Sequence, residues 1–309
     1  MTLYKFVNQQ LDLVSNTKDS FFVYEVAKES TMVIYEFQRA QKELLQTSSK
    51  ELPIKYLLAI VNNNAKAYDY TEEYEFRVRG FLSEPELSRF EKEEKQALVD
   101  GFEDVRKLAV SCIVAQFFDL FRESNVLSKL FGKEWQRGGG GDEYGPMEVA
   151  VQTLADALEM ARRHLRDKFV GDVAKEALDR LLQRYVQELS GRSGYTAETV
   201  AAVERDRRLV EQALGPLVQG KSFLARRLNL MSGIATFLRT PMDDQGQFIL
   251  TYNALLDDYP DLTPELVKRI VGSRLDCDKD ALAEVIAACR GILPSDKQLK
   301  PFFSDVKLK

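Results

Sequence analysis

The residues of this chain that come nearest to a catalytic pattern are those from Asp257 to Asp261, which read Asp257-Asp258-Tyr259-Pro260-Asp261. In all-helical isoprenoid synthases a DDxxD spacing aligns carboxylates on one helix face, where they hold magnesium and a substrate pyrophosphate. That arrangement needs a continuous helix, because only residues three or four apart share a face. Pro260 restricts the residue before it to extended conformations and interrupts a helix. We therefore expect these carboxylates to point apart. The alternative interpretation is an isoprenoid-synthase-like enzyme that uses the same aspartates to bind magnesium.

Three further aspartates, Asp276, Asp278 and Asp280, imitate the first half of a calcium-binding EF-hand loop. Counted from Asp276, the sixth position is Ala281 and the twelfth is Ala287, so the turn glycine and the bidentate glutamate are both missing. Apolar residues follow Asp278 at helical spacing. The sequence therefore predicts that Asp278 caps a helix and that no calcium site forms here.

Side chains that commonly carry acid-base, nucleophilic or zinc chemistry are scarce. The one histidine, His164, follows two arginines and is expected on a solvated helix face. The three cysteines, Cys112, Cys277 and Cys289, form no CxxC pair, and Cys112 falls on an apolar stripe where a thiol behaves as a small hydrophobe. The sequence thus identifies no catalytic, cofactor-binding or metal-binding residue. We expect a protein that is not an enzyme and needs no cofactor.

Composition narrows the class of protein further. The chain has 309 residues, of which 45% are hydrophobic and 29% charged, as in soluble globular proteins. Its net charge of -5 offers no general attraction to a phosphate backbone, so we expect no binding to nucleic acid. No signal-peptide pattern follows the first residues, and the most apolar run, Leu108 to Phe121, is too short to span a bilayer. We therefore expect a cytoplasmic protein.

The last residues combine basic and aromatic side chains. Phe302 and Phe303 lie among lysines at positions 297, 300, 307 and 309. Such a tail has the composition to meet an anionic membrane surface. Terminal segments are usually poorly ordered, however, so we expect a disordered tail and at most peripheral membrane association.

Helical periodicity dominates the chain, and it predicts roughly ten α-helices joined by short connections and no sustained strand. One apolar stripe ends at Ser190-Gly191 and is formed by Leu178, Leu181, Leu182, Tyr185, Val186 and Leu189. Ser83 with Glu86 predicts a capping box. Thr196 and Thr263 are expected to cap two later helices.

Four consecutive glycines, Gly138 to Gly141, precede Gly145-Pro146 and cannot be helical throughout. We expect an N-terminal helical bundle over residues 1–137, a glycine-rich loop or linker over 138–146, and a C-terminal helical bundle over 147–309. No Lys-Ser or Lys-Thr follows the glycines, so they are not expected to cradle phosphate.

Several local strings occur in an order that carries a family resemblance. They are a hydrophobic helix running into paired asparagines at residues 56–63, the helical strings 178–186 and 203–206, and the closing segment 255–278 with its Tyr-Pro-Asp turn. In this order they resemble the C-terminal part of exocyst complex component 3, the Sec-six subunit of the vesicle-tethering exocyst, over most of residues 50–290. Two relatives of the same architecture, tumour-necrosis-factor-induced protein 2 and the component 3-like proteins, remain open alternatives.

The resemblance implies an all-α fold, an elongated rod of stacked helical bundles. It also implies a non-enzymatic scaffold that helps to tether secretory vesicles to the plasma membrane before SNARE-mediated fusion. The implied partners are other exocyst subunits, SNARE proteins and their regulators, with a homodimer as an open alternative. Family members begin with coiled-coil-forming sequence, so this chain would be a C-terminal fragment, cytoplasmic and recruited to sites of secretion.

Overall fold

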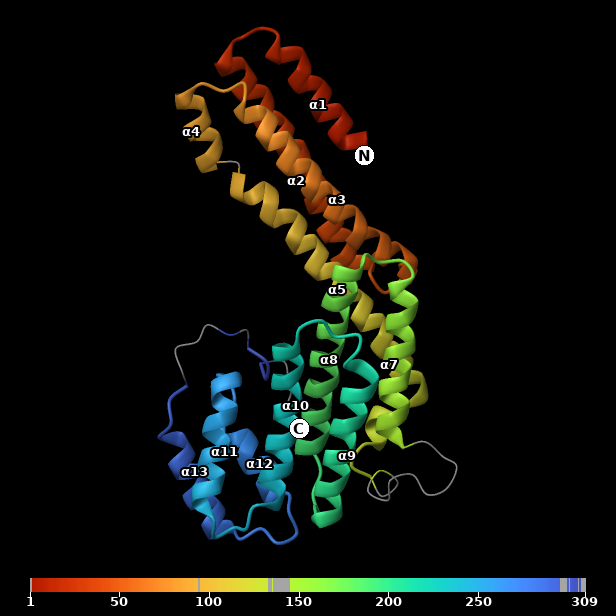
Figure 1. Ribbon diagram of the computed structural model, residues 1–309, viewed down its shortest axis with the longest axis vertical. Helices are drawn as coiled ribbons and strands as arrows, with labels where there is room; N and C mark the ends of the chain where they lie inside the picture. Colours follow the sequence, from red (N-terminus) through yellow and green to blue (C-terminus); the bar gives the residue numbers. More distant parts are fainter. Residues whose placement is uncertain are drawn as a thin grey trace. The chain divides into compact units, whose positions relative to one another are not determined.

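The fold is built from α-helices. The computed structural model describes residues 2–93, 95–132, 135, 145–294, 299, 301–304 and 306. Within those residues there is no strand, and one isolated bridge joins Tyr195 to Arg274 (Figure 1). The predicted all-helical class is therefore confirmed, with twelve α-helices described where roughly ten were expected. The rod of stacked bundles stays a prediction.

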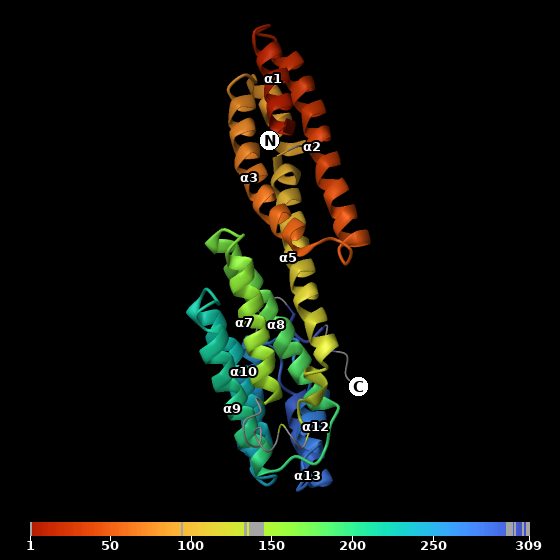
Figure 2. The same ribbon diagram turned by 90° about the vertical axis from the view of Figure 1, so that its right-hand side faces the viewer.

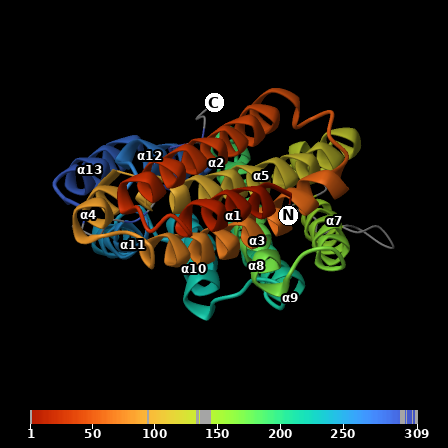
Figure 3. The same cartoon turned by 90° about the horizontal axis from the view of Figure 1, so that it is seen from above.

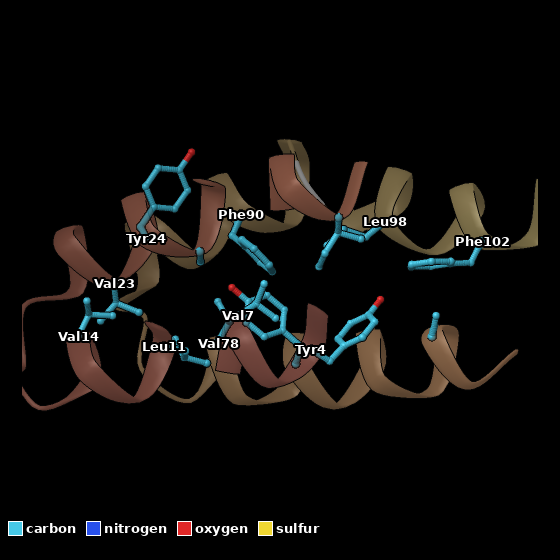
Figure 4. Close-up of a cluster of buried hydrophobic side chains, with 14 residues drawn as sticks. Tyr4, Val7, Leu11, Val14, Val23, Tyr24, Val78, Phe90, Leu98 and Phe102 are labelled. Atoms are coloured by element: carbon cyan, nitrogen blue, oxygen red, sulfur yellow. The ribbon is translucent and has the colours of Figure 1, made fainter. Parts of the chain in front are cut away.

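The chain forms two compact units, of which the first comprises residues 1–116 and 161–169. Its helices are α1 (Thr2–Ser15), α2 (Ser20–Ser48), α3 (Ile54–Arg79), α4 (Glu84–Glu93) and the first part of α5 (Lys95–Ser124). Figure 3 shows α1 running beside α2 and α3, which it contacts. A core of fourteen buried apolar residues joins these helices (Figure 4). The hydroxyl of Tyr4, a core residue, lies 2.6 Å from that of the buried Thr71 on α3, so the polar ends of both side chains are satisfied.

The second unit comprises residues 117–160 and 170–309. Its elements are a 3-10 turn η1 (Leu127–Lys129), α7 (Pro146–Arg162), α8 (Asp167–Ser190), α9 (Ala197–Leu214), α10 (Lys221–Arg239), α11 (Gln245–Asp258), α12 (Pro264–Gly272) and α13 (Lys279–Arg290). Helices α9 and α10 run side by side (Figures 1 and 2). Helix α11 contacts α10 and α13, and α12 contacts α13. The turn that follows α11 begins at Tyr259, whose hydroxyl donates to the carbonyl oxygen of Arg226 on α10.

Two helix ends follow the side chains that the sequence singled out. The hydroxyl of Thr263 accepts the amide of Leu266 at 3.3 Å, and Pro264 occupies the first turn of α12 as predicted. Helix α8 ends at Ser190, and the six predicted stripe residues are all buried. Burial of an apolar stripe against neighbouring helices is what stabilises a helix of this kind.

Helix α4 begins after Ser83, as predicted, but its first residues are capped differently from the prediction. The Ser83 hydroxyl hydrogen-bonds the Glu86 carboxylate. The Ser83 amide does not reach Glu86, however, but donates to the hydroxyl of Ser20 at 2.6 Å. The predicted reciprocal capping box is therefore wrong at this end. A side chain from the start of α2 takes the place that Glu86 was expected to fill.

The predicted boundary at residues 138–146 falls largely outside the described residues, which resume at Gly145. The compact units divide the chain at other positions, between residues 116 and 117 and around 161–169. The division into bundles over 1–137 and 147–309 stays a prediction.

Candidate interaction site

The aspartate-rich segment does not form a magnesium-binding helix face. Helix α11 ends at Asp258, and Tyr259 follows with φ -137° and ψ 79°, outside the helical region. The predicted break before Pro260 is therefore confirmed. Asp257 is exposed on the last turn of α11, whereas Asp261 lies beyond the helix, in the turn that leads to α12. Across the described part of the chain, no group of three His, Cys, Asp or Glu residues is arranged to hold a metal ion.

Tyr259 anchors the turn in the interior. Its ring is 1% exposed, and its hydroxyl donates to the carbonyl oxygen of Arg226 on α10 at 2.9 Å. Burial raises the pKa of Tyr259 to about 12, so the hydroxyl keeps the proton that it donates. The segment that imitates a metal motif is thus a turn held onto α10.

Asp261 binds backbone from the end of the chain. Its Oδ2 atom accepts the amide of Phe303 at 2.5 Å and the amide of Ser304 at 3.1 Å. Its Oδ1 atom is buried and has no hydrogen-bond partner. Hydrogen bonds to an ionised carboxylate are stronger than neutral ones, and here two consecutive amides share one oxygen.

Arg227 of α10 lies at the centre of the same region. Its Nε and Nη2 atoms bond Oδ1 and Oδ2 of Asp179 on α8 at 2.5 and 2.9 Å, a bidentate pair. Burial disfavours the charged guanidinium, but the hydrogen bonds and charge of Asp179 raise the pKa of Arg227 above its ordinary value. The guanidinium carbon lies 4.7 Å from the ring centres of Phe223 and Phe302 and 5.3 Å from that of Tyr259. A permanent positive charge is thus surrounded by three aromatic faces.

The rings of Phe302 and Phe303 pack against that of Tyr259. Their ring centres lie 5.1 and 5.6 Å from that of Tyr259 and 5.0 Å from each other. The carbonyl of Phe302 accepts Nε2 of Gln183 on α8 at 2.7 Å. Both rings are buried, with 2% and 8% exposed. The expectation of a disordered tail is therefore wrong at these two residues, because the aromatic surface finds cover that the sequence does not reveal. The four lysines of the tail lie outside the described residues.

We call the residues that hold this segment the Arg227 site. They are Asp179, Gln183, Phe223, Arg227, Tyr259 and Asp261. They come from α8, α10 and the turn between α11 and α12. The arrangement offers one side-chain donor and one side-chain acceptor for peptide backbone, together with an aromatic, cationic surface. These groups bind peptide rather than perform chemistry on it.

A cavity of about 290 Å³ lies beside the same turn and is lined by Tyr252, Leu256, Pro260 and Cys289 among others. Burial raises the pKa of Cys289 to about 11, so the thiol is protonated and is a poor nucleophile at neutral pH. At the edge of the cavity Glu265 pairs with Arg290 at 2.9 Å. The cavity therefore offers apolar walls rather than an acid-base pair.

The second aspartate cluster is a helix start, as predicted. Oδ1 of Asp278 accepts the amides of Asp280 at 2.9 Å and Ala281 at 3.2 Å, which caps α13. Asp276 instead forms a bidentate pair with Arg274 at 2.8 and 2.6 Å. Hydrogen bonds from Arg274 lower the pKa of Asp276. The carboxylates of Asp276 and Asp278 thus have separate structural roles.

His164 is exposed, as expected, but it lies two residues beyond the end of α7 rather than on a helix face. Its carbonyl oxygen accepts Nδ2 of Asn62 at 2.6 Å. Cys112 is half-buried, with its sulfur 3.7 Å from the carbonyl oxygen of Leu45. Neither side chain is placed beside a partner that would activate it.

Sequence reasoning missed a buried carboxyl, Asp206 of α9. Its Oδ2 atom accepts Nε1 of Trp135 at 2.6 Å and the hydroxyl of Tyr185 at 3.0 Å. Burial raises its pKa to about 7, although both hydrogen bonds favour the charged form. Trp135 precedes Asp206 by 71 residues, so no local pattern could have linked them. The only available signal was a lone tryptophan, which when buried usually needs an acceptor.

The comparisons with known proteins agree with this helical architecture. The sequence model of the family described as exocyst complex component Sec6 matches residues 1–279. The structure is similar to that described as the C-terminal domain of the exocyst subunit Sec6p, with a TM-score of 0.87 and 14% identity over 100% of this chain and 84% of that chain. It is also similar to the crystal structure of M-Sec, with a TM-score of 0.66 and 14% identity over 100% of this chain and 57% of that one. At such identities the structural likeness shows the fold, and the family-model match carries the relationship.

Proposed function

Because the chain belongs to the exocyst complex component Sec6 family, we propose that it acts as the exocyst subunit itself and holds secretory vesicles at the plasma membrane before SNARE-mediated fusion. A non-enzymatic scaffold role in a tethering complex follows from the family. The match over residues 1–279 is the observation that carries the proposal. It favours the subunit, which the resemblance named component 3, over the relatives of the same architecture.

The outer face of α2 supports a role in binding other proteins. Phe22, Val33, Phe37 and Leu44 are between 41% and 47% exposed. Their spacings of 11, 4 and 7 residues place them along one side of the helix. An exposed apolar stripe of this kind is typical of a surface that packs against another helix. We propose that other exocyst subunits bind through such helix faces rather than in a deep pocket.

SNARE proteins and their regulators are proposed as further partners, and a homodimer as an alternative assembly. No described helix has the length and apolar character needed to cross a membrane. We propose that the protein reaches the plasma membrane periphery through its partners. The magnesium-dependent alternative loses its basis, because Pro260 ends the helix that would have aligned the carboxylates.

Co-elution of the purified chain with each purified exocyst subunit on size exclusion tests the proposal. We expect at least one subunit to form a stable complex, and we expect Phe37→Glu to weaken it about tenfold if α2 is the surface used, since a charge would be buried there. Leu250→Glu is the control, at an exposed apolar position on α11 that is 65% exposed against 43% for Phe37. A chain that keeps its helical circular dichroism and yet binds no exocyst subunit would overturn the proposal. The same assay with a SNARE protein tests that finer assignment separately.

A further inference from the structure

We propose that the Arg227 site is a peptide-binding site for an extended segment with two consecutive phenylalanines, and that the chain's own Phe302 and Phe303 occupy it. This inference goes beyond the tethering role and does not depend on it, because it rests on the contacts of the site alone.

The site recognises the backbone of three consecutive residues. Gln183 donates to the carbonyl of Phe302, and Asp261 accepts the amides of Phe303 and Ser304. These bonds fix the position and direction of a bound segment whatever its side chains are. Oδ1 of Asp261 is buried without a hydrogen-bond partner, so the tail satisfies one of the two carboxylate oxygens.

Side-chain selectivity comes from the aromatic and cationic surface. The first ring of the segment lies 4.7 Å from the Arg227 guanidinium, and both rings contact Tyr259. An aromatic ring gains cation–π and edge-to-face contacts that an aliphatic side chain of similar size does not. Two adjacent phenylalanines therefore fit this surface better than leucine or valine would.

The side chains of the Arg227 site are held in place by contacts that do not involve the tail. Asp179 bonds Arg227 in a bidentate pair, Phe223 covers the same guanidinium, and Tyr259 is tied to the α10 backbone. All six residues of the Arg227 site lie within residues 1–279, the region that the family model matches, whereas the tail lies after it. A preformed surface binds a segment without paying again for its own ordering, so the same contacts are open to another chain of the same chemistry.

The chain's own tail competes with any such partner. It is joined to the receptor through the polypeptide, so its effective concentration is high, on the order of millimolar for a short connection. A separate segment with a Phe-Phe pair should therefore bind weakly to the intact chain and strongly once the tail is released. The tail thereby sets how readily a partner gains access.

The test uses the full chain with its site vacated by Phe302→Ala and Phe303→Ala together. The probe is a fluorescein-labelled peptide with the sequence of residues 299–309, and binding is followed by fluorescence anisotropy. We expect saturable binding to the vacated chain and binding about tenfold or more weaker to the native chain, because only the native tail competes. A peptide with alanine in place of both phenylalanines should not bind.

Substitutions in the Arg227 site of the Phe302→Ala, Phe303→Ala chain show whether the probe binds at that site. Arg227→Ala and Asp261→Ala should each weaken the probe about tenfold or more, since each removes charge-assisted contacts. Asp257→Ala, an exposed carboxylate on the preceding helical turn, is the matched control and should change nothing. Equal binding by the Arg227→Ala variant would show that the probe binds elsewhere and would overturn the proposal.

A second way of loosening the tail keeps both rings in place. Ser304→Pro removes the amide that donates to Asp261, and Ser304 is itself exposed. This variant should bind the probe several-fold more tightly than the native chain. If the probe binds neither this variant nor the vacated chain, while both melt cooperatively, the tail contacts are purely structural and the proposal is wrong.

Discussion

Two regions of the second unit each arrange aromatic rings around one ionisable side chain, a carboxyl in the first and a guanidinium in the second. Around Asp206 the rings of Phe131, Trp135 and Tyr185 are at most 4% exposed, and the carboxyl accepts hydrogen bonds from two neutral donors. In the Arg227 site the aspartates meet a guanidinium and backbone amides. In the first region the carboxyl is fully buried, and the nearest guanidinium nitrogen, Nη2 of Arg205, lies 4.0 Å from Oδ1 of Asp206. In the second region Asp179 forms a close bidentate pair with Arg227.

This difference leads us to treat the Asp206 cluster as part of the fixed core, and the tail bound at the Arg227 site as a contact that can open. Charge is disfavoured at Asp206, whose pKa is raised by burial, and its Trp135 and Tyr185 partners come from segments far apart in the chain. Opening that cluster means unfolding the unit. The Arg227 site instead holds residues near the chain's end, and under our proposal these residues leave while the helices stay packed.

The largest effect is expected from Asp206→Ala. The change leaves the indole N–H of Trp135 and the hydroxyl of Tyr185 buried without an acceptor, which costs about 2–5 kcal/mol of unfolding free energy. Denaturant titration followed by circular dichroism measures it. Asp257→Ala, at an exposed carboxylate, is the control and should change stability by less than about 0.5 kcal/mol. Equal losses in the two variants would remove the distinction between core and surface carboxyls.

The pH dependence of stability sharpens the same contrast. The folded-state pKa of Asp206, about 7, lies above the ordinary value of 3.8, so the folded chain binds this proton more tightly than the unfolded chain. The resulting stability is fully present below about pH 4 and is lost as pH rises through 7. The free energy of unfolding should therefore fall between these limits, and Asp206→Asn should flatten that part of the curve. An unchanged slope in the variant would mean that Asp206 is already ionised across this range.

An intermediate effect is expected from Arg227→Met. The substitution keeps much of the volume but leaves the mostly buried Asp179 carboxylate without its cation and removes the contact with Phe302. We expect a loss of about 1–3 kcal/mol, together with release of the tail. Arg239→Met breaks an exposed pair with Glu204 and should cost about 0–1 kcal/mol. Similar small losses in both would show that the Arg227 pair behaves as a surface ion pair.

The smallest effect on this scale is expected from Asp278→Ala at the exposed start of α13. Loss of the acceptor for the amides of Asp280 and Ala281 should cost about 0.5–2 kcal/mol. The melting temperature should fall equally with calcium and with a chelator, because no bound ion contributes to folding. A native melting temperature that rises with calcium, and a variant that no longer responds, would restore the EF-hand interpretation.

The sequence could predict what depends on neighbouring residues. Pro260 ended α11, Thr263 and Asp278 capped the next two helices, and the α8 stripe was buried, because each outcome follows from local backbone and periodicity. The order of such strings was enough to indicate the family.

What escaped prediction depends on segments far apart in the chain. Asp261 meets Phe303 across 42 residues, and Asp206 meets Trp135 across 71. No periodicity pairs such positions, and the composition of the tail favoured disorder. A Phe-Phe pair near a chain end and a lone tryptophan were the signals that buried partners were needed.

Native-state hydrogen exchange tests the contrast between the two regions most directly. The indole N–H of Trp135 should exchange only through unfolding of the unit, with the denaturant dependence of global unfolding. The amides of Phe303 and Ser304 should exchange about tenfold or more faster, through local opening that low denaturant does not affect. If those two amides are protected to the same degree as the Trp135 indole, and respond to denaturant in the same way, the Arg227 site is part of the fixed core and the tail is not exchangeable.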